Sequence, residues 1–251
     1  MEQKDIYLSV IIPAYNEDER IEITIHQVYK YLARVPYTWE IIVVSDGSKD
    51  LTIQKVSQLA KKIPNVWWID RKENRGKGYT VREGMLKANG RLRLFADADN
   101  STDISHFDKM RPLFDKGYDV VICSRDPKDA AGARQEVSQQ WHKRLIGNIG
   151  NLYIQLLAVR GIWDTQCGFK AFRADAAKRI FSITRINRWG FDVEVLALAR
   201  AMKMQIGIVA AYWVNDPRSK VKLSGYLYTL WETTKIGWWI RRNRYHMSDD
   251  R

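Results

Sequence analysis

The sequence predicts an α/β fold in which helices flank a mixed, mostly parallel sheet. Short β-branched runs alternate with amphipathic stretches across the first half of the chain, and each run is followed by turn residues. The length of 251 residues is sufficient for one large α/β domain. We therefore expect a main domain over residues 1–217 and an appended C-terminal segment over residues 218–251.

Five strands are expected in the first half of the chain, at residues 8–13, 40–45, 66–70, 91–96 and 120–124. Two helices between them are predicted from apolar residues that recur every three or four positions and so share one face. The first face comprises Ile21, Ile25, Val28 and Leu32, and the second comprises Leu51 (or Thr52), Val56, Leu59 and Ile63.

Residues 126–160 are expected to form a mobile loop followed by an amphipathic helix. Residues 127–140 are polar and lack periodicity, which is typical of a loop that a ligand can order. Apolar residues then return at helical spacing, at Leu145, Ile149, Leu152, Leu156 and Val159.

Charge and cysteine content restrict the class of protein. The chain has 41 Lys and Arg against 29 Asp and Glu, a net charge of +12, which favours an anionic partner such as nucleic acid, anionic lipid or a phosphorylated substrate. Cys123 and Cys167 belong to no C-x-x-C pair or His cluster, so neither a disulfide framework nor a zinc site is expected. Because no signal-like N-terminus or apolar run of about 18 residues occurs, we expect a cytoplasmic chain without a membrane span.

Polar clusters follow all five expected strands: PAYNED, SDGSKD, ENRGKG, DADNS and SRD. Ligands of doubly wound sheets bind at the carboxyl ends of the strands, so a site is expected there. Asp97 and Asp99 are spaced i and i+2, so both carboxylates face the same way. A Mg²⁺ or Mn²⁺ ion would convert their repulsion into a binding site, although a solvated pair in a turn is the alternative.

Three other strand-end residues are candidates, and two of them, Glu17 and Asp46, also have a structural interpretation. Glu17 either accepts hydrogen bonds from a nucleoside or complements a helix dipole. Asp46 either accepts hydrogen bonds from a base or ribose or is a turn residue. Lys77 lies between two glycines, an arrangement suited to an anionic oxygen.

The chain lacks both a Walker sequence and a G-x-G-x-x-G after the first strand, which disfavours a P-loop or dinucleotide-binding protein.

The motifs SVIIPAYNE, DGSKD, NRGKG, DAD, TQCGFKAF and RWGFDVEVL, in this order, resemble those of family 2 glycosyltransferases with the GT-A (Rossmann-like) fold. Within that family the chain is most similar to the polyprenyl- or dolichyl-phosphate hexose synthases, and among these to the dolichyl-phosphate β-glucosyltransferases, through residues 164–170 and 191–194. The resemblance covers about residues 6–220. It implies inverting, metal-dependent transfer of glucose from UDP-glucose to a polyprenyl phosphate, with GDP-mannose as the alternative donor.

The resemblance also implies roles for individual residues. It places the nucleotide sugar on Pro13, Ala14, Tyr15, Glu17, Asp46, Lys77, Asp97, Ala98, Asp99 and Gln166. It implies metal ligation by Asp97, Asp99 and Gln166, and catalytic roles for Asp99, Arg125 and Asp192, with Arg125 beside the donor diphosphate or acceptor phosphate. Ser101 stands where mannose-transferring relatives often have Gln, so a ligand role there is in doubt.

The proposed acceptor needs little activation. A phosphate monoester has a second pKa near ~6 and is mostly dianionic at neutral pH, so its oxygen can attack the anomeric carbon without a strong base. The four histidines, His26, His106, His142 and His246, are accordingly interpreted as surface or helix residues.

The remaining polar candidates stay ambiguous. Asp192 and Glu194 either orient the sugar or acceptor or form salt bridges with Arg188 and Arg185. Trp189 either stacks on the sugar or belongs to the core. Lys220 either contacts the acceptor phosphate or lies in a solvated basic loop.

Residues 218–251 are expected to form a basic amphipathic helix on a membrane surface, because a lipid-linked acceptor lies in a bilayer. The segment has eight Lys and Arg against three Asp and Glu, a net charge of +5. We therefore expect a peripheral protein on the cytoplasmic face of a membrane, with a core-packing or dimer-forming helix as the alternative. A nucleic-acid-binding protein and a catalytically silent sugar-nucleotide sensor are the other classes, disfavoured by the acidic strand ends and the D-x-D respectively.

Overall fold

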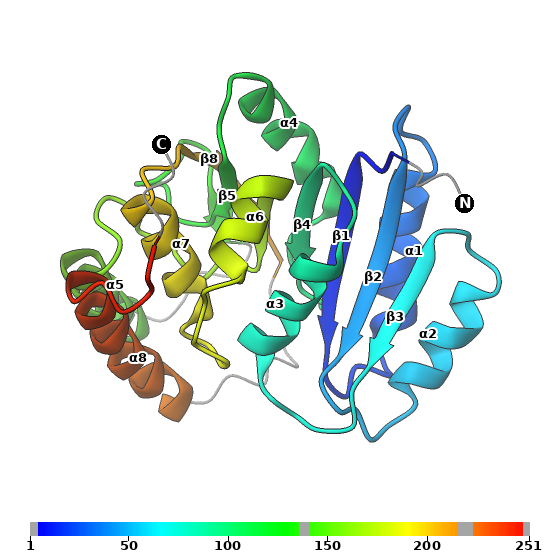
Figure 1. Cartoon of the computed structure of the whole chain (residues 1–251), viewed down its shortest axis with the longest axis horizontal. Helices are drawn as coiled ribbons and strands as arrows, with labels where there is room; N and C mark the ends of the chain where they lie inside the picture. Colours follow the sequence, from blue (N-terminus) through cyan, green and yellow to red (C-terminus); the bar gives the residue numbers. More distant parts are fainter. Residues whose placement is uncertain (1–4, 136–140, 215–222, 248–251) are drawn as a thin grey trace.

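A seven-stranded sheet runs through the middle of the protein (Figure 1). The computed structural model describes residues 5–135, 141–214 and 223–247. The strands of this sheet are β1 (Leu8–Ala14), β2 (Trp39–Ser45), β3 (Val66–Asp70), β4 (Leu92–Ala96), β5 (Val120–Ser124), β7 (Phe169–Arg173) and β8 (Ile206–Ala210). The five strands expected from the first half of the sequence are confirmed, with ends that differ by one residue at most.

The strand order is β3-β2-β1-β4-β7-β5-β8, and β7 alone among these strands runs antiparallel to its neighbours. The predicted mixed, mostly parallel sheet is therefore confirmed. Because β7 is reversed, its first residue lies at the edge where β4 ends, and Phe169 pairs with Ala96. The loop that precedes β7 thus meets the carboxyl ends of the parallel strands.

Helices cover both faces of the sheet. One face carries α1 (Ile21–Leu32), α2 (Thr52–Ala60), the short η1 (Ile104–His106) and α4 (Phe107–Asp115), and the other carries α3 (Lys77–Lys87), α6 (Ala174–Phe181) and α7 (Phe191–Ala201). Successive strand side chains alternate between the two cores: in β1, Val10 and Ile12 pack on one side and Ile11 on the other. The predicted apolar faces of α1 and α2 are buried.

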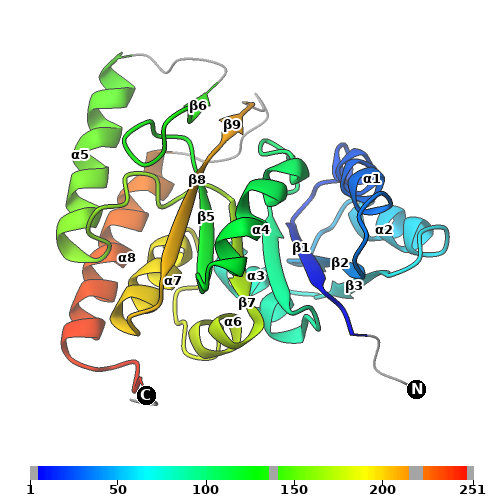
Figure 2. The ribbon, with the colours of Figure 1, turned by 90° about the horizontal axis from the view of Figure 1, so that it is seen from above.

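Two further helices, α5 (Trp141–Leu157) and α8 (Leu223–Arg241), lie side by side at one end of the molecule (Figure 2). They approach closely, since a Cβ at Gly237 would lie 2.7 Å from the carbonyl oxygen of Leu157. The hydroxyls of Tyr153 and Thr234 form a hydrogen bond of 2.8 Å across the pair. The inner face of α8 packs on α7, so this helix is part of the folded body and contributes the fully buried Ile236 to its core.

A two-stranded parallel ribbon of β6 (Arg134–Gln135) and β9 (Tyr212–Trp213) lies beyond the end of the sheet. Val214 follows β9 and donates its backbone N–H to the carbonyl oxygen of Ser101, at 2.9 Å. The ribbon is thereby joined to the loop after β4. Within the ranges given above, no helix combines the length and the apolar character needed to cross a bilayer.

Candidate active site

A pocket of about 1060 Å³ lies at the carboxyl ends of β1, β2, β4 and β5. Twelve of the residues expected from the sequence line it together: Pro13, Ala14, Tyr15, Glu17, Asp46, Lys77, Asp97, Ala98, Asp99, Arg125, Gln166 and Asp192. The thirteenth, Lys220, lies outside the described residues. Residues far apart in the chain therefore converge on one cavity, as the strand-end rule for α/β sheets requires.

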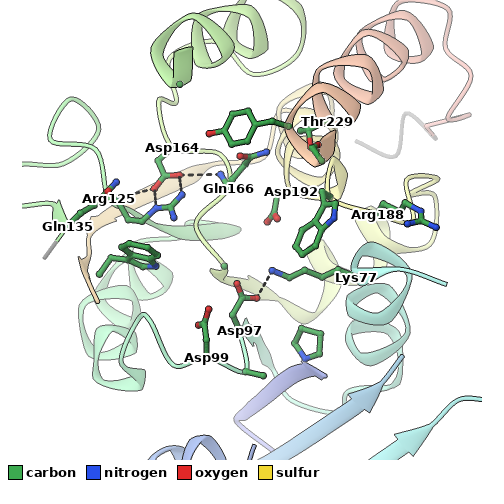
Figure 3. A pocket seen from close by; sticks show the side chains of 18 of the residues that line it. Lys77, Asp97, Asp99, Arg125, Gln135, Asp164, Gln166, Arg188, Asp192 and Thr229 are labelled. Carbon is green, nitrogen blue, oxygen red and sulfur yellow. Dashed lines mark hydrogen bonds and ion pairs between the residues drawn. The ribbon is translucent and has the colours of Figure 1, made fainter. Parts of the chain in front are cut away.

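Asp97 leaves the end of β4 and pairs with Lys77, the first residue of α3. Lys77 Nζ lies 2.6 Å from Asp97 Oδ1 (Figure 3). Burial by itself would lower the pKa of Lys77, but the carboxylates of Asp97, Asp192 and Asp99 outweigh burial and raise it. Lys77 therefore stays protonated inside the pocket and supplies a fixed positive charge.

Gly168 makes room for the carboxylate of Asp97. A Cβ at this glycine would lie 2.0 Å from Asp97 Oδ2. The same backbone also holds the D-x-D loop in place, since Asp97 donates its N–H to the Gly168 carbonyl oxygen at 3.1 Å. This role of Gly168 could not be predicted from the sequence, because Asp97 lies 71 positions earlier in the chain.

Asp99 is the second carboxylate of the pair. It accepts a hydrogen bond of 2.9 Å from the backbone N–H of Ser101. Burial and the neighbouring charge of Asp97 nevertheless raise its pKa, so its negative charge is incompletely compensated. A divalent cation would favour the ionised form of both carboxylates, and the residues present fit such an ion.

The protein alone offers this ion few ligands. Across the described part of the chain, no group of three or more His, Cys, Asp or Glu side chains is arranged to hold a metal. An ion on Asp97 and Asp99 would therefore complete its coordination largely with oxygens of a bound ligand, as Mg²⁺ commonly does with phosphates. Gln166 also lines the pocket, and its metal-ligand role remains a prediction.

Arg125 follows β5 and is locked against Asp164. Its Nε and Nη2 donate to the two carboxylate oxygens at 2.7 and 2.8 Å, and its backbone N–H donates at 2.9 Å (Figure 3). This two-point geometry orients the guanidinium. Burial opposes the charge of Arg125, but Asp164 prevails and raises its pKa, so the cation is permanent.

Asp129 anchors the loop between β5 and β6, and with it Asp164. Its carboxylate accepts hydrogen bonds of 2.7 Å from the Ser124 hydroxyl and of 2.8 Å from the backbone N–H groups of Trp163 and Asp164. This part of the expected mobile loop is therefore tied to the sheet. The mobility itself remains a prediction, and residues 136–140 of that loop lie outside the described ranges.

Asp192, on the first turn of α7, pairs with a lysine that the sequence analysis missed. Lys170, in the middle of β7, is completely buried and donates to the Asp192 carboxylate and to the Cys167 carbonyl oxygen. A buried cation below the pocket thus pairs with Asp192 and fixes the orientation of its carboxylate. The predicted alternative partners, Arg185 and Arg188, form no ion pair with Asp192 among the described residues.

Glu194 proves to be structural. It is fully buried and accepts hydrogen bonds from the backbone N–H groups of Arg185 and Ile186, at 2.8 and 3.0 Å, and from the Tyr245 hydroxyl at 2.7 Å. It does not line the pocket. Of the two interpretations, the structure supports a structural role, although the partners are backbone groups and a tyrosine rather than arginine side chains.

Asp46, at the end of β2, also lines the pocket. Its carboxylate accepts hydrogen bonds from the backbone N–H groups of Arg75 and Gly76, both at 2.8 Å, and from Arg71 Nη2 at 2.5 Å. All three partners donate to the carboxylate, which acts here as an acceptor, so a ligand that contacts it would do so through a donor such as an N–H or O–H. Glu17 accepts a hydrogen bond of 2.9 Å from Arg20.

His106, expected to be a surface or helix residue, is the last residue of the short helix η1 but is not a surface residue. Its side chain is buried, and both ring nitrogens are engaged: Nδ1 donates to the Asp103 carbonyl oxygen at 2.9 Å, and Nε2 accepts from the Tyr212 N–H at 3.0 Å. The spacing of His106 relative to Tyr212 offered no local signal, because the contact spans 106 positions.

Helices α5 and α8 form a wall of the pocket that the sequence analysis did not predict. They contribute uncharged residues, namely Gly147, Asn148, Asn151, Gly225, Tyr226 and Thr229. The opposite wall carries the D-x-D and Lys77. A ligand in this cavity would therefore contact a charged end and a less polar end.

Comparison with known proteins agrees with this geometry. The model of the glycosyl transferase family 2 matches residues 9–181. A dolichyl-phosphate β-glucosyltransferase from Trichomonas vaginalis is 33% identical over 258 residues, covering 99% of this chain and 78% of the relative. The human dolichyl-phosphate β-glucosyltransferase is 35% identical over 228 residues, covering 85% and 69%.

Solved structures of similar fold include mannosyl-3-phosphoglycerate synthase from Rubrobacter xylanophilus, with a TM-score of 0.66 and 16% identity over 98% of this chain and 77% of that one. Glucosyl-3-phosphoglycerate synthase from Mycobacterium tuberculosis, bound to UDP, gives a TM-score of 0.65 at 16% identity, over 98% and 82%. At these identities the similarity establishes the GT-A architecture alone. The family match covers more than half of the sequence, and the chain therefore belongs to glycosyl transferase family 2 and is a glycosyltransferase.

Proposed function

We propose that this enzyme transfers glucose from UDP-glucose to a polyprenyl (dolichyl) phosphate, with inversion at the anomeric carbon. The observation that supports it best is one pocket lined both by the Asp97–Asp99 pair and by two permanent cations, Lys77 and Arg125. Relatives named dolichyl-phosphate β-glucosyltransferase, at 33–37% identity, favour this donor sugar and acceptor.

In the reaction, an oxygen of the acceptor phosphate forms a bond to the anomeric carbon while the bond from that carbon to the donor diphosphate breaks. The nucleoside diphosphate leaves with the electron pair. Lys77 and Arg125 are suited to stabilise the charge that develops on it, because both are held in place before the substrate arrives and need no reorganisation.

The proposed cofactor is Mg²⁺ or Mn²⁺, held by Asp97 and Asp99 with Gln166 as a further candidate ligand. When bound, such an ion neutralises charge on the diphosphate as a Lewis acid. Lys77 then has a second function. Its ammonium group lies against Asp97 and offsets part of the negative charge of the acidic pair.

Asp192 is proposed to orient the sugar or the acceptor rather than to remove a proton. Its ion pair with Lys170 fixes the orientation of the carboxylate, which lines the pocket. The dianionic acceptor phosphate brings no proton that must be removed at neutral pH. Trp189, more than a third exposed on the pocket wall, offers its ring to the sugar face.

The outer surface formed by α5 and α8 is proposed to lie on the membrane that contains the acceptor, on its cytoplasmic face. Large apolar side chains are exposed there: Ile149, Leu152 and Leu156 from α5, and Leu227, Trp231 and Trp238 from α8. Such exposed groups next to Lys235 and Arg241 are typical of helices that bind a bilayer without crossing it. The C-terminal segment that begins at residue 218 would thus act in lipid binding.

One experiment tests donor and acceptor together. Purified enzyme is mixed with polyprenyl phosphate in vesicles, Mg²⁺ or Mn²⁺, and either labelled UDP-glucose or labelled GDP-mannose. We expect label from UDP-glucose to enter the organic phase, and EDTA to abolish transfer. Label from GDP-mannose alone would establish the mannose alternative, and no lipid-linked label from either donor would reject the proposal.

A further inference from the structure

We infer that Glu232, on the inner face of α8, is a positioning residue of the active site. It holds the turn at Gly190 so that the residues on both sides of that turn face the pocket. The inference rests on the proposed function for its catalytic readout. The contact itself is independent of which sugar or lipid is used.

Glu232 is buried and accepts a hydrogen bond of 2.8 Å, through Oε2, from the backbone N–H of Gly190. The fit is close on the glycine side as well. A Cβ at Gly190 would lie 2.6 Å from Glu232 Oε2 and 2.8 Å from Glu232 Cβ. The carboxylate therefore fills the space that a side chain at position 190 would occupy.

The residues on either side of the turn at Gly190 line the pocket. Trp189 precedes it and lines the pocket, with its ring centroid 5.5 Å from Lys77 Nζ. Asp192 follows it on the first turn of α7 and also lines the pocket. A shift of the turn would therefore move the proposed sugar-facing ring and the oriented carboxylate together.

Glu232 differs from the other buried side chains on the inner face of α8, because its hydrogen-bond partner lies outside the helix. The other buried side chains of this face are Thr229, Thr233 and Ile236. The threonine hydroxyls donate to carbonyl oxygens one turn earlier, at 2.9 Å each, so they are satisfied within α8. A buried carboxylate is unfavourable unless it is hydrogen-bonded, and burial does raise the pKa of Glu232. The partner that compensates it, the Gly190 N–H, belongs to the active-site turn.

The same helix has its exposed aromatic residues on the opposite side. Trp231 and Trp238 are about half exposed, at 51% and 47%, and Leu227 is 65% exposed. One rigid helix thus connects the proposed lipid-facing surface to the turn beside the reacting groups. Glu232 is the contact through which α8 reaches this turn.

The test compares Glu232→Leu, Glu232→Gln and the matched control Thr233→Val, which alters an equally buried neighbour on α8. Gln retains an oxygen that can accept from Gly190, whereas Leu does not. We expect Glu232→Leu to lower kcat by about tenfold or more with UDP affinity changed by no more than about threefold. Glu232→Gln and Thr233→Val should remain within about threefold of the parent enzyme in both quantities.

Gly190→Ala tests the contact from the other side, and keeps the inference testable if Glu232→Leu does not fold. Gly190 has φ −70° and ψ −5°, which alanine adopts without strain, so the added methyl acts mainly by displacing the Glu232 carboxylate. We expect the same loss of kcat, together with faster amide hydrogen exchange in residues 184–191.

Unchanged kcat in folded Glu232→Leu or Gly190→Ala would overturn the inference, as would Glu232→Gln being as impaired as Glu232→Leu. If the parent enzyme transfers no sugar at all, the proposed function fails, and hydrogen exchange then decides alone. Faster exchange at residues 184–191 in Glu232→Leu but not in Thr233→Val would support the positioning contact. Equal exchange in the two variants would reject it.

Discussion

Buried charges of the active site lie beside opposite charges. Lys170 pairs with Asp192, Arg125 with Asp164, and Lys77 with Asp97. An isolated buried charge is strongly unfavourable, so each pair compensates a charge that would otherwise stand unpaired in or beside the pocket. Asp99 is different, because burial and the charge of Asp97 raise its pKa. An added cation would therefore have its most favourable new electrostatic interaction with the Asp99 carboxylate.

Gly168→Ala should displace Asp97 without changing any charged residue. The new methyl would lie 2.0 Å from Asp97 Oδ2, so the carboxylate must move away from its position beside Lys77. We expect Mn²⁺ affinity in the presence of UDP, measured by calorimetry, to fall about tenfold or more, with a similar loss of kcat. Gly150→Ala is the control, because its added Cβ would make only ordinary contacts, at 3.8 Å or more. Normal Mn²⁺ binding by Gly168→Ala would contradict this account of the site.

The ribbon of β6 and β9 depends on the protonation state of His106. The ring donates through Nδ1 and accepts through Nε2, which is possible only for the neutral form. Trp213 of β9 lies beneath Arg125, whose guanidinium carbon is 5.3 Å from a ring centroid of Trp213. Loss of the hydrogen bond from Tyr212 would thus disturb the neighbouring Trp213, which lines the active-site pocket.

Acidification should destabilise the protein through this histidine. Burial, reinforced by Lys109, lowers the pKa of His106 in the folded state. The unfolded chain therefore takes up the proton first, so the stabilisation is complete above about pH 6.5 and is lost as the pH falls through the lowered folded pKa. Urea titrations between pH 7.5 and 5.5 should show a smaller pH-dependent loss in His106→Asn than in the parent enzyme. His26→Asn, on the exposed side of α1, should behave as the parent does.

Elements differed in how well the sequence predicted them. The first five strands were found because each is a continuous apolar run followed by turn residues, which is what a buried parallel strand requires. β7 was missed as a strand because the buried Lys170 interrupts its apolar pattern, and its partner Asp192 is 22 residues away. In α5, the apolar spacing correctly indicated a helix. However, Ile149 and Leu156 are 62% and 77% exposed, so periodicity identified an apolar face without showing what covers it.

The outer surface of α5 and α8 gives a direct test of lipid binding. Replacing Trp231 and Trp238 together by serine should reduce co-sedimentation with polyprenyl-phosphate-containing vesicles by about fivefold or more, because both rings are about half exposed. Trp68→Ser is the matched control, since this 38% exposed tryptophan lies on β3, at the other end of the molecule (Figure 1). Equal vesicle binding by the double variant and the control would remove α8 from the lipid-binding surface.

Across the whole molecule, the site is assembled from segments that no local pattern connects. The strand-end clusters could be predicted from the sequence because parallel strands all end at one edge of a sheet. The roles of Asp164 and Asp129 could not be predicted in this way. Each accepts hydrogen bonds from a side chain or backbone group that lies more than 30 positions away in the sequence. The wall formed by α5 and α8 depends on how two helices pack, which their own sequences do not determine.

The net charge of +12 also acts over the whole molecule. An excess of Lys and Arg attracts the protein to an anionic surface over about 8 Å at physiological ionic strength and over shorter distances at higher salt. Binding to vesicles containing anionic lipid should therefore weaken as NaCl is raised from about 0.05 to 0.5 M, while binding to neutral vesicles should change little. Equal salt sensitivity on both vesicle types would show that surface charge does not guide association.

Because β7 runs in the reverse direction, its site residues precede the strand in the sequence, whereas those of the parallel strands follow them. In β1, β2, β4 and β5 the polypeptide reaches reactive groups on leaving the sheet, whereas Gln166 and Gly168 are passed on the way in to Phe169. We therefore expect a scan of all single substitutions to show that tolerance to substitution falls toward the last residues of β1, β2, β4 and β5. Along β7, tolerance should instead rise from the first residue onward. One inserted residue ahead of Phe169 would be as damaging as one after Ala96, because both ends meet at the same floor of the cavity.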